Sequence, residues 1–224
     1  MAEHALVDND VVIKVACYAL VDETLAATTL ARTPPAMLGV GRFVARGRLA
    51  RDRRVRDRAR ALDALERLLS VVVPLEPEER ETSLAAELEA GAIRLNVELD
   101  GGESQLIAML MTRGCPLLVT GDKRAVAALA ALAVAGLSGR VACLEQVLAD
   151  VVRVRGADAV RAAVCSEPGA DTALSLCFGC SSAKPPNEPA VLDALSSYAE
   201  HLRGRCGDIL LAGPDLAAVA PRRD

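Results

Sequence analysis

The chain has 224 residues and a formal net charge of −4, and 52% of its residues are hydrophobic. This composition supports a buried core and excludes wholesale disorder, while the negative charge argues against a protein that simply coats nucleic acid. The N-terminus lacks the basic and then apolar pattern of a signal peptide, and the longest apolar run, residues 125–137, is shorter than the about 20 residues that span a bilayer. We therefore expect a cytoplasmic location and no membrane partner.

The pattern of apolar runs and chain breakers predicts short strands that alternate with helices. Strands are expected at residues 5–7, 71–73, 93–97, 116–120 and 141–143, and helices at 11–20, 24–31, 36–70 in one or two pieces, 76–90, 103–112, 123–135 and 145–154. This alternation indicates an α/β three-layer sandwich with a central parallel sheet. We expect strand 5–7 to be central, with strand 116–120 next to it.

Beyond residue 155 the sequence pattern changes, and no further strands are expected. Helical pieces are separated by loops, and the loop at residues 181–189 holds three prolines. We therefore divide the chain into a first domain, residues 1–154, and a helical extension, residues 155–224, whose role the sequence does not indicate.

Positive charge is concentrated in one stretch. Residues 42–60 contain nine Arg and two Asp, a net +7 that leaves −11 for the remainder of the chain. Such a stretch marks either a surface that binds phosphates or a solvated helix face, and we weigh the two equally. With only four aromatic residues, a platform that stacks bases on rings is not expected. The expected contacts to nucleic acid are Arg42, Arg46, Arg48, Arg51, Arg53, Arg54 and Lys123.

Three acidic residues come from distant parts of the sequence to one expected edge of the sheet. Asp8 and Asp122 each follow an expected strand, and Glu103 opens a helix after a Gly-Gly turn. Ligands bind at the carboxyl ends of the strands in open parallel sheets, so we expect the three carboxylates to meet there. Clustered carboxylates repel one another and are usually stabilised by Mg²⁺ or Mn²⁺, which prefer oxygen ligands.

Each of these acids also has a purely structural interpretation. Asp122 is placed to cap the helix that follows it, Glu103 is a first-turn residue favoured by the helix dipole, and Asp8 is a loop acid. The joint placement of the three acids favours a common site.

Three short motifs resemble those of PIN-domain nucleases in order and approximate spacing over residues 5–150. Leu6–Ile13 resembles the opening strand that ends in the first metal-binding Asp, residues 99–105 resemble the "GE" helix start, and residues 117–122 resemble the late strand with its terminal Asp. The resemblance implies a metal-dependent nuclease that cuts phosphodiester bonds, most often in single-stranded RNA, with Mg²⁺ or Mn²⁺ as cofactor. The implied catalytic and metal-binding residues are Asp8, Glu103 and Asp122, supported by Thr120.

Two positions depart from the PIN pattern. Asp10 stands where the family usually has Asn, Ser or Thr, and it is a candidate additional ligand. Residues 36–50 contain no acid, so the early helical acid of many PIN toxins is missing or displaced to Asp52. The resemblance allows a protein inhibitor or a homodimer as partner and leaves a toxin–antitoxin role open.

Two rival functions remain. Asp8-Asn9-Asp10-Val11 also satisfies the first motif of haloacid-dehalogenase-like phosphatases, with Asp8 as nucleophile and Asp10 as acid/base, although Val126 stands where a later acid is needed. The missing early acid favours a catalytically degenerate PIN-like binding module.

The chain contains seven cysteines, an odd number, and several lie in runs typical of a core. A reduced compartment therefore fits better than a disulfide framework. Cys177 and Cys180 form a CxxC pair that could bind zinc with Cys165 and Cys206, but the spacing is irregular and no second CxxC is present. We expect buried cysteines and no zinc site.

Overall fold

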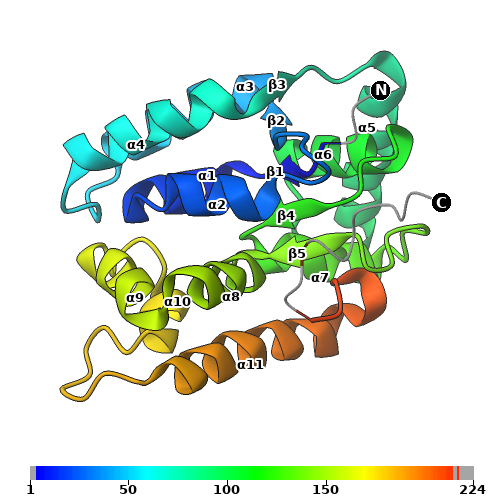
Figure 1. The fold of residues 1–224 in the computed structure, drawn as a ribbon. Coiled ribbons are helices and arrows are strands. Elements are labelled where there is room, and N and C mark those ends of the chain that lie inside the picture. Colours follow the sequence, from blue (N-terminus) through cyan, green and yellow to red (C-terminus); the bar gives the residue numbers. More distant parts are fainter. Residues whose placement is uncertain (1–3, 214–215, 217–224) are drawn as a thin grey trace.

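A computed structural model describes residues 4–213 and 216 of the chain, and it places one five-stranded sheet at the centre (Figure 1). The strands are β1 Leu6–Val7, β2 Ala36–Leu38, β3 Val73–Leu75, β4 Leu118–Thr120 and β5 Val141–Cys143. Their order is β3-β2-β1-β4-β5, and each neighbouring pair is parallel. The expected α/β class is confirmed, and β1 is central with β4 beside it.

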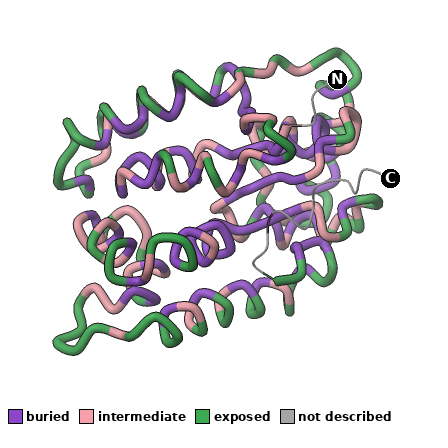
Figure 2. Tube along the Cα trace, in the orientation of Figure 1, coloured by how far each residue is buried: buried purple, intermediate pink, exposed green. Residues whose placement is uncertain are grey.

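Helices cover both faces of this sheet. They are α1 Asn9–Tyr18, α2 Val21–Thr28, α3 Gly39–Arg51, α4 Arg58–Val71, α5 Glu79–Leu95, α6 Gly101–Thr112, α7 Lys123–Ala131, α8 Leu144–Arg155, α9 Ala157–Ser166, α10 Thr172–Cys177, α11 Glu188–Cys206 and the 3-10 helix η1 Gly207–Ile209. One hydrophobic cluster joins one face of the sheet to α1, α2, α3, α4, α8, α9, α10 and the start of α11, and a second joins the other face to α5, α6, α7 and the end of α11. The buried strand residues lie between these layers (Figure 2).

Three expected elements differ from the structure. Residues 36–38 were expected to be helical and form β2, because their position between β1 and β3 buries them on both faces, where no alternating pattern marks a strand. The strand expected at 93–97 is wrong: its residues close α5, which Asn96 ends in a left-handed conformation. The strand expected at 71–73 begins later, at Val73, and tolerates Pro74 because β3 is an edge strand.

The helical extension packs onto the α/β part of the chain. Residues of α9, α10 and the start of α11 belong to the first hydrophobic cluster, and the end of α11 belongs to the second. Leu210 then forms a parallel bridge to Val141 at the edge of β5, and the backbone of Leu211 donates to the Val141 carbonyl at 2.7 Å. The ends of the two proposed segments, residues 1–3, 214–215 and 217–224, lie outside the described residues.

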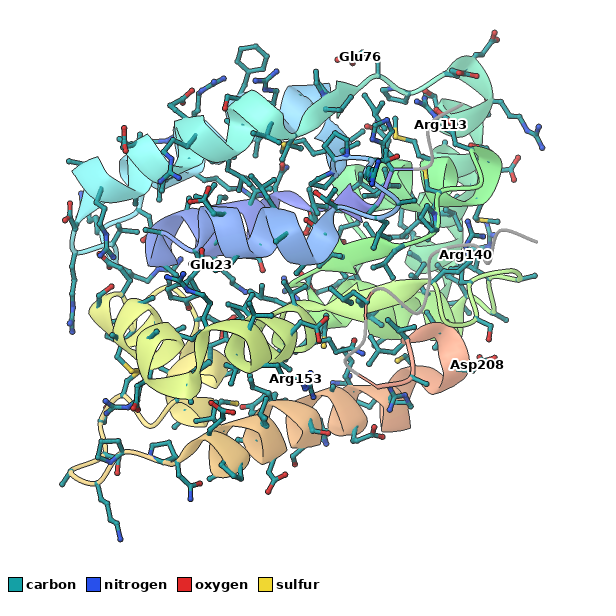
Figure 3. The ribbon with its side chains drawn as sticks, in the orientation of Figure 1. Glu23, Glu76, Arg113, Arg140, Arg153 and Asp208 are labelled. Atoms are coloured by element: carbon teal, nitrogen blue, oxygen red, sulfur yellow. A yellow bond between two sulfur atoms is a disulfide. The ribbon has the colours of Figure 1, made fainter. Side chains whose placement is uncertain are left out.

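A buried ion pair ties the start of α5 to the end of α6. Glu81 is 1% exposed and accepts hydrogen bonds from the Arg113 guanidinium at 2.6 and 2.5 Å. Arg113 also donates to the Glu76 carbonyl at 2.7 Å, and both residues are labelled in Figure 3. The Arg113 side chain, together with a backbone bond from Glu78, lowers the pKa of Glu81 to about 2 despite burial.

We expect the substitution Glu81→Gln to lower the free energy of unfolding by about 2–3 kcal/mol near neutral pH, because it leaves Arg113 without its charge partner. The folded pKa of about 2 lies below the ordinary value of 4.5, so this stabilisation is complete above pH 4.5 and is lost as the pH falls towards 2. Urea unfolding of both proteins at neutral and acidic pH measures the difference. A difference that does not shrink below pH 4.5 would contradict the assignment.

Candidate active site

A cleft of about 530 Å³ opens at the carboxyl end of the sheet, and we call it the acid cleft. Five of its lining residues are acidic: Asp8, Asp10, Asp100, Glu103 and Asp122. The rest of the lining comes from the start of α1, the end of β2, α3, the first turn of α6 and the start of α7. The four acids singled out from the sequence as ligands therefore line one cleft.

Helix capping fixes three of these acids. Asp8 caps α1 and accepts a hydrogen bond from the Asn9 backbone at 2.6 Å, and Asp122 caps α7 and accepts one from the Arg124 backbone at 2.8 Å. Glu103 closes a capping box by accepting from the Asp100 backbone at 2.9 Å. The structural interpretations of Asp122 as a helix cap and of Glu103 as a first-turn residue are thus correct, whereas Asp8, expected as a loop acid, is a helix cap as well. Capping does not explain why three helix N-termini, with their positive dipole ends, meet at one cleft.

Thr120 links the ends of β1 and β4. Its hydroxyl donates to the Asp8 carboxylate at 3.4 Å and accepts from the Asp122 backbone at 3.1 Å. Asp8 is only 8% exposed, and burial together with the charge of Asp10 raises its pKa to about 6. Asp8 is therefore ionised at neutral pH only at an energetic cost.

Glu103 is under greater electrostatic strain than Asp8. Burial is the main cause, and the charges of Asp100, Asp122 and Asp8 add to it, so that its pKa rises to about 8 against the pull of the Asp100 N–H. In residues 4–213, no Lys or Arg forms an ion pair with Glu103 or with Asp8. These two carboxylates lack a compensating positive charge.

Asp122, by contrast, has a cation. Burial alone would raise the pKa of Asp122, but hydrogen bonds from Arg124, whose guanidinium lies 3.0 Å away, hold it below its ordinary value. Arg124 also binds Glu98 at 2.6 Å on the exposed surface.

Asp10 is held by a lysine that the helical extension also binds. The Lys14 ammonium lies 2.6 Å from Asp10 and 2.7 Å from Asp171, and these two charges raise the pKa of Lys14 although burial opposes them. A Cβ at Gly121 would lie 2.1 Å from the Asp10 carboxylate. Glycine at that position therefore lets the β4–α7 turn approach α1.

Sequence reasoning misplaced one acid and missed two more. Asp52 does not line the acid cleft, because it ends α3 and binds the Arg54 guanidinium at 2.8 Å. Asp100 does line it, and the pattern Asp-Gly-Gly-Glu of a capping box could have found it. Asp171, which holds Lys14, gave no sequence signal, since only the packing of the extension brings it there.

The basic residues expected to contact nucleic acid divide into separate groups. Arg48 lines the acid cleft. Arg42 donates to the Leu69 carbonyl at 2.7 Å, and Arg46 binds Glu66 at 2.6 Å, so both serve the packing of α3 against α4.

Lys123 is directed away from the acid cleft, towards α8 and α11. Its ammonium lies 2.5 Å from the buried Glu145 and 4.6 Å from the centre of the Tyr198 ring. Arg53 is exposed, and Arg51 and Arg54 line a neighbouring cleft.

The donor set of the acid cleft fits an oxygen-preferring cation in chemistry. All of the candidate ligands are carboxylates, and Asp8 and Glu103 have raised pKa values that a cation would lower. In the described part of the chain, however, no three His, Cys, Asp or Glu side chains are arranged to hold a metal ion. Direct ligation by three acids would require side-chain rotation, and bridging waters are the alternative.

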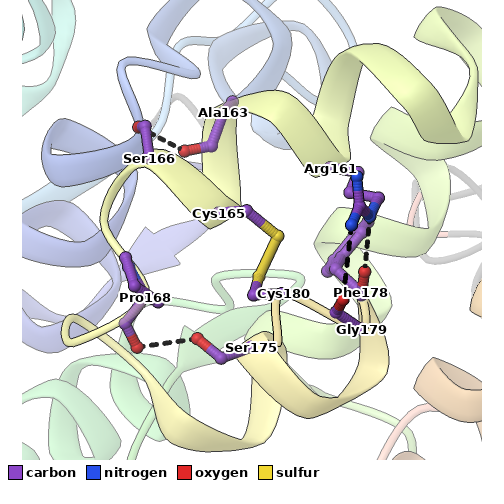
Figure 4. The surroundings of a disulfide bond; sticks show 9 residues. All are labelled: Arg161, Ala163, Cys165, Ser166, Pro168, Ser175, Phe178, Gly179 and Cys180. Carbon is purple, nitrogen blue, oxygen red and sulfur yellow. Dashed lines mark hydrogen bonds between the residues drawn. A yellow bond between two sulfur atoms is a disulfide. The ribbon is translucent and has the colours of Figure 1, made fainter. Parts of the chain in front are cut away.

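Two cysteines are joined by a disulfide, so the expectation that the cysteines are reduced is wrong for this pair. Cys165 lies in the last turn of α9 and Cys180 follows α10, and their Cα atoms are 5.1 Å apart (Figure 4). The other two cysteines of the proposed zinc site, Cys177 and Cys206, are buried in different hydrophobic clusters. The fold of the extension, not the local CxxC spacing, decides this pairing.

Comparisons with known proteins give no family assignment. No family model, no curated protein and no solved structure matches the chain. Across residues 4–213, no helix has the length and apolar character needed to cross a membrane. The acid cleft and the three sequence motifs are therefore the observations that bear on function.

Proposed function

We propose that the chain is a PIN-like, divalent-metal-dependent nuclease that hydrolyses phosphodiester bonds in single-stranded RNA. The observation that carries the proposal is that five acids line one cleft, and that two of them, Asp8 and Glu103, form no ion pair with a Lys or Arg among the described residues. The choice of RNA rests on the resemblance of the three sequence motifs to PIN domains.

The residues of the acid cleft would have different roles in such a hydrolysis. Asp8 and Glu103 are the carboxylates that would hold the cation, with Asp122 as the third ligand. A bound Mg²⁺ or Mn²⁺ supplies an activated water near neutral pH and offsets charge on the phosphate. Thr120 keeps the Asp8 carboxylate oriented, and the Arg48 guanidinium at the same cleft is placed to bind a phosphate oxygen.

Neither histidine of the chain is positioned to act as a general acid or base at the acid cleft. The two histidines of the chain are His4, whose ring bonds to the Pro34 carbonyl at 2.7 Å, and His201, which is exposed on α11. Neither lines the acid cleft. Water is therefore the nucleophile that the cleft best supports, and among the described residues that line the cleft the carboxylates are the groups that can act as its base.

The direct test is cleavage of a labelled single-stranded oligoribonucleotide by the purified full-length chain. We expect cleavage with Mg²⁺ or Mn²⁺ and none in EDTA, because the carboxylates alone leave both the water and the phosphate charge without a partner. Cleavage that persists in EDTA would contradict the proposal. Metal binding without cleavage of RNA or DNA would favour the degenerate module, and turnover of an aryl phosphate instead would favour the phosphatase.

A further inference from the structure

A second cleft of about 410 Å³ adjoins the acid cleft, and we call it the basic cleft. It is lined by Asp10, Ile13, Lys14, Cys17, Arg48, Arg51, Asp52, Arg54 and Ala170. Asp10 and Arg48 line both clefts, so the two are continuous at this boundary.

The basic cleft carries uncompensated positive charge. Two of its cations are neutralised, because Lys14 lies between Asp10 and Asp171, and Arg54 binds Asp52. The other two are Arg48 and Arg51, and neither forms an ion pair with a carboxylate in the described part of the chain. The Arg51 guanidinium only donates to the Gly47 carbonyl of its own helix, at 2.8 Å. Both guanidinium groups therefore have N–H donors that no carboxylate of the described residues binds.

One face of α3 runs along both clefts. Val40, Val44 and Arg48 line the acid cleft, and Arg48 and Arg51 line the basic cleft, so the contacts recur at helical spacing. At about 1.5 Å per residue this face is about 16 Å long. That length matches on the order of four or five nucleotides at the stacked spacing of about 3.4 Å per nucleotide.

The helical extension contributes to the wall of the basic cleft. Its residue Ala170 lines the cleft, and the buried Glu167 accepts hydrogen bonds from the backbones of Arg56 and Asp57 at 2.7 and 2.6 Å. These bonds fix the α3–α4 loop, which carries Asp52 and Arg54. The disulfide of Cys165 and Cys180 closes the segment that contains Ala170 and Glu167 (Figure 4).

We propose that the basic cleft is a subsite for the phosphates that flank the scissile bond, so that the ligand is a single nucleic-acid strand of several nucleotides lying along α3. Arg48 and Arg51 bind the flanking phosphates, and the extension contributes Ala170 to the wall of the same cleft. Naming the ligand as the substrate strand rests on the proposed nuclease function, whereas the anion site itself does not.

The test is the binding of fluorescein-labelled oligouridylates of three and eight nucleotides to the full chain in EDTA, followed by fluorescence anisotropy. We expect the octamer to bind at least about tenfold more tightly than the trimer, because the α3 face along both clefts matches about four or five nucleotides and only the octamer is long enough to cover it. In the double variant Arg48→Glu, Arg51→Glu, the octamer should bind no more tightly than the trimer. The slope of log affinity against log salt concentration for octamer binding should fall by about two units.

A charge-matched control separates a local site from general attraction. Arg80 and Arg205 are exposed and line neither cleft, so Arg80→Glu with Arg205→Glu makes the same change in charge. In this control variant the octamer should still bind at least about tenfold more tightly than the trimer. If the double variant at Arg48 and Arg51 fails to fold, the single change Arg51→Ala, at an exposed position, should still weaken octamer binding about threefold.

The possible outcomes distinguish failure of the phosphate subsite from failure of the proposed nuclease function. Equal octamer affinity in the Arg48 and Arg51 variant and in the control would overturn the subsite. Since no bond is cut in EDTA, a protein that binds octamers through Arg48 and Arg51 but never cleaves them would keep the subsite and lose the nuclease. A protein that cleaves RNA but binds the octamer no more tightly than the trimer would keep the nuclease function and lose the subsite.

Discussion

The substitution Asp8→Asn should reduce the rate of RNA cleavage by about 100-fold or more. Asparagine is as good a helix cap as aspartate, so the hydrogen bond from the Asn9 backbone and the start of α1 are retained. What is lost is the negative charge, and with it a ligand to the cation. A 100-fold loss corresponds to about 2.7 kcal/mol of transition-state stabilisation, a modest share of what a bound metal ion supplies.

The chain offers a matched control for this change. Asp57 caps α4 by accepting from the Arg60 backbone at 3.0 Å, and it lines neither cleft. Asp57→Asn should leave cleavage unchanged, measured as the single-turnover rate on the same oligoribonucleotide. Asp10→Asn should have a milder effect than Asp8→Asn, because Lys14 already neutralises Asp10. Full activity in Asp8→Asn would refute the assigned role.

Glu103→Gln should reduce cleavage by a similar factor while making the metal-free protein more stable. Glutamine keeps the capping box with Asp100, so the start of α6 is unchanged. The folded pKa of about 8 lies above the ordinary 4.5, so the charged form is penalised in the folded state. This penalty is complete above pH 8, and the wild type regains stability as the pH falls through 8 towards 4.5.

The size of this gain is limited because Glu103 is partly exposed to solvent. We expect the free energy of unfolding in EDTA at pH 8 to rise by about 1–2 kcal/mol, or a few degrees in Tm. Glu81→Gln provides the contrast, since Glu81 holds the same position in a capping box but is paired with Arg113 and should lose stability. Thermal unfolding of both variants decides the point, and a loss of stability in Glu103→Gln would contradict the strain inferred at this carboxylate.

The sequence was most informative where a strand ends at the sheet edge. The apolar runs before Asp8 and Asp122 marked β1 and β4, and parallel strands bring their carboxyl ends to one edge, so the shared cleft was predictable from order alone. Strand β2 was missed because it has three residues, all buried, and its identity depends on pairing with β1 and β3. A pattern this short carries no period.

Contacts made by the helical extension could not be predicted from the sequence. The pair of Lys14 and Asp171 joins residues more than 150 positions apart, and the disulfide of Cys165 and Cys180 depends on how α9 and α10 fold back. The basic stretch was visible, but its division into packing residues such as Arg46 and cleft residues such as Arg51 follows from the rotation of α3 about its axis.

The most direct measurement is a calorimetric titration of Mn²⁺ into the metal-free full-length chain at pH 7.5, for the wild type, Asp8→Asn and the capping control Asp57→Asn. Binding depends on the ionised carboxylate, which Asp8 presents above its pKa of about 6. We predict saturable binding by the wild type and by Asp57→Asn, and an affinity at least about tenfold weaker in Asp8→Asn. Absence of binding by the wild type, or equal affinity in all three proteins, would contradict a metal site at the acid cleft.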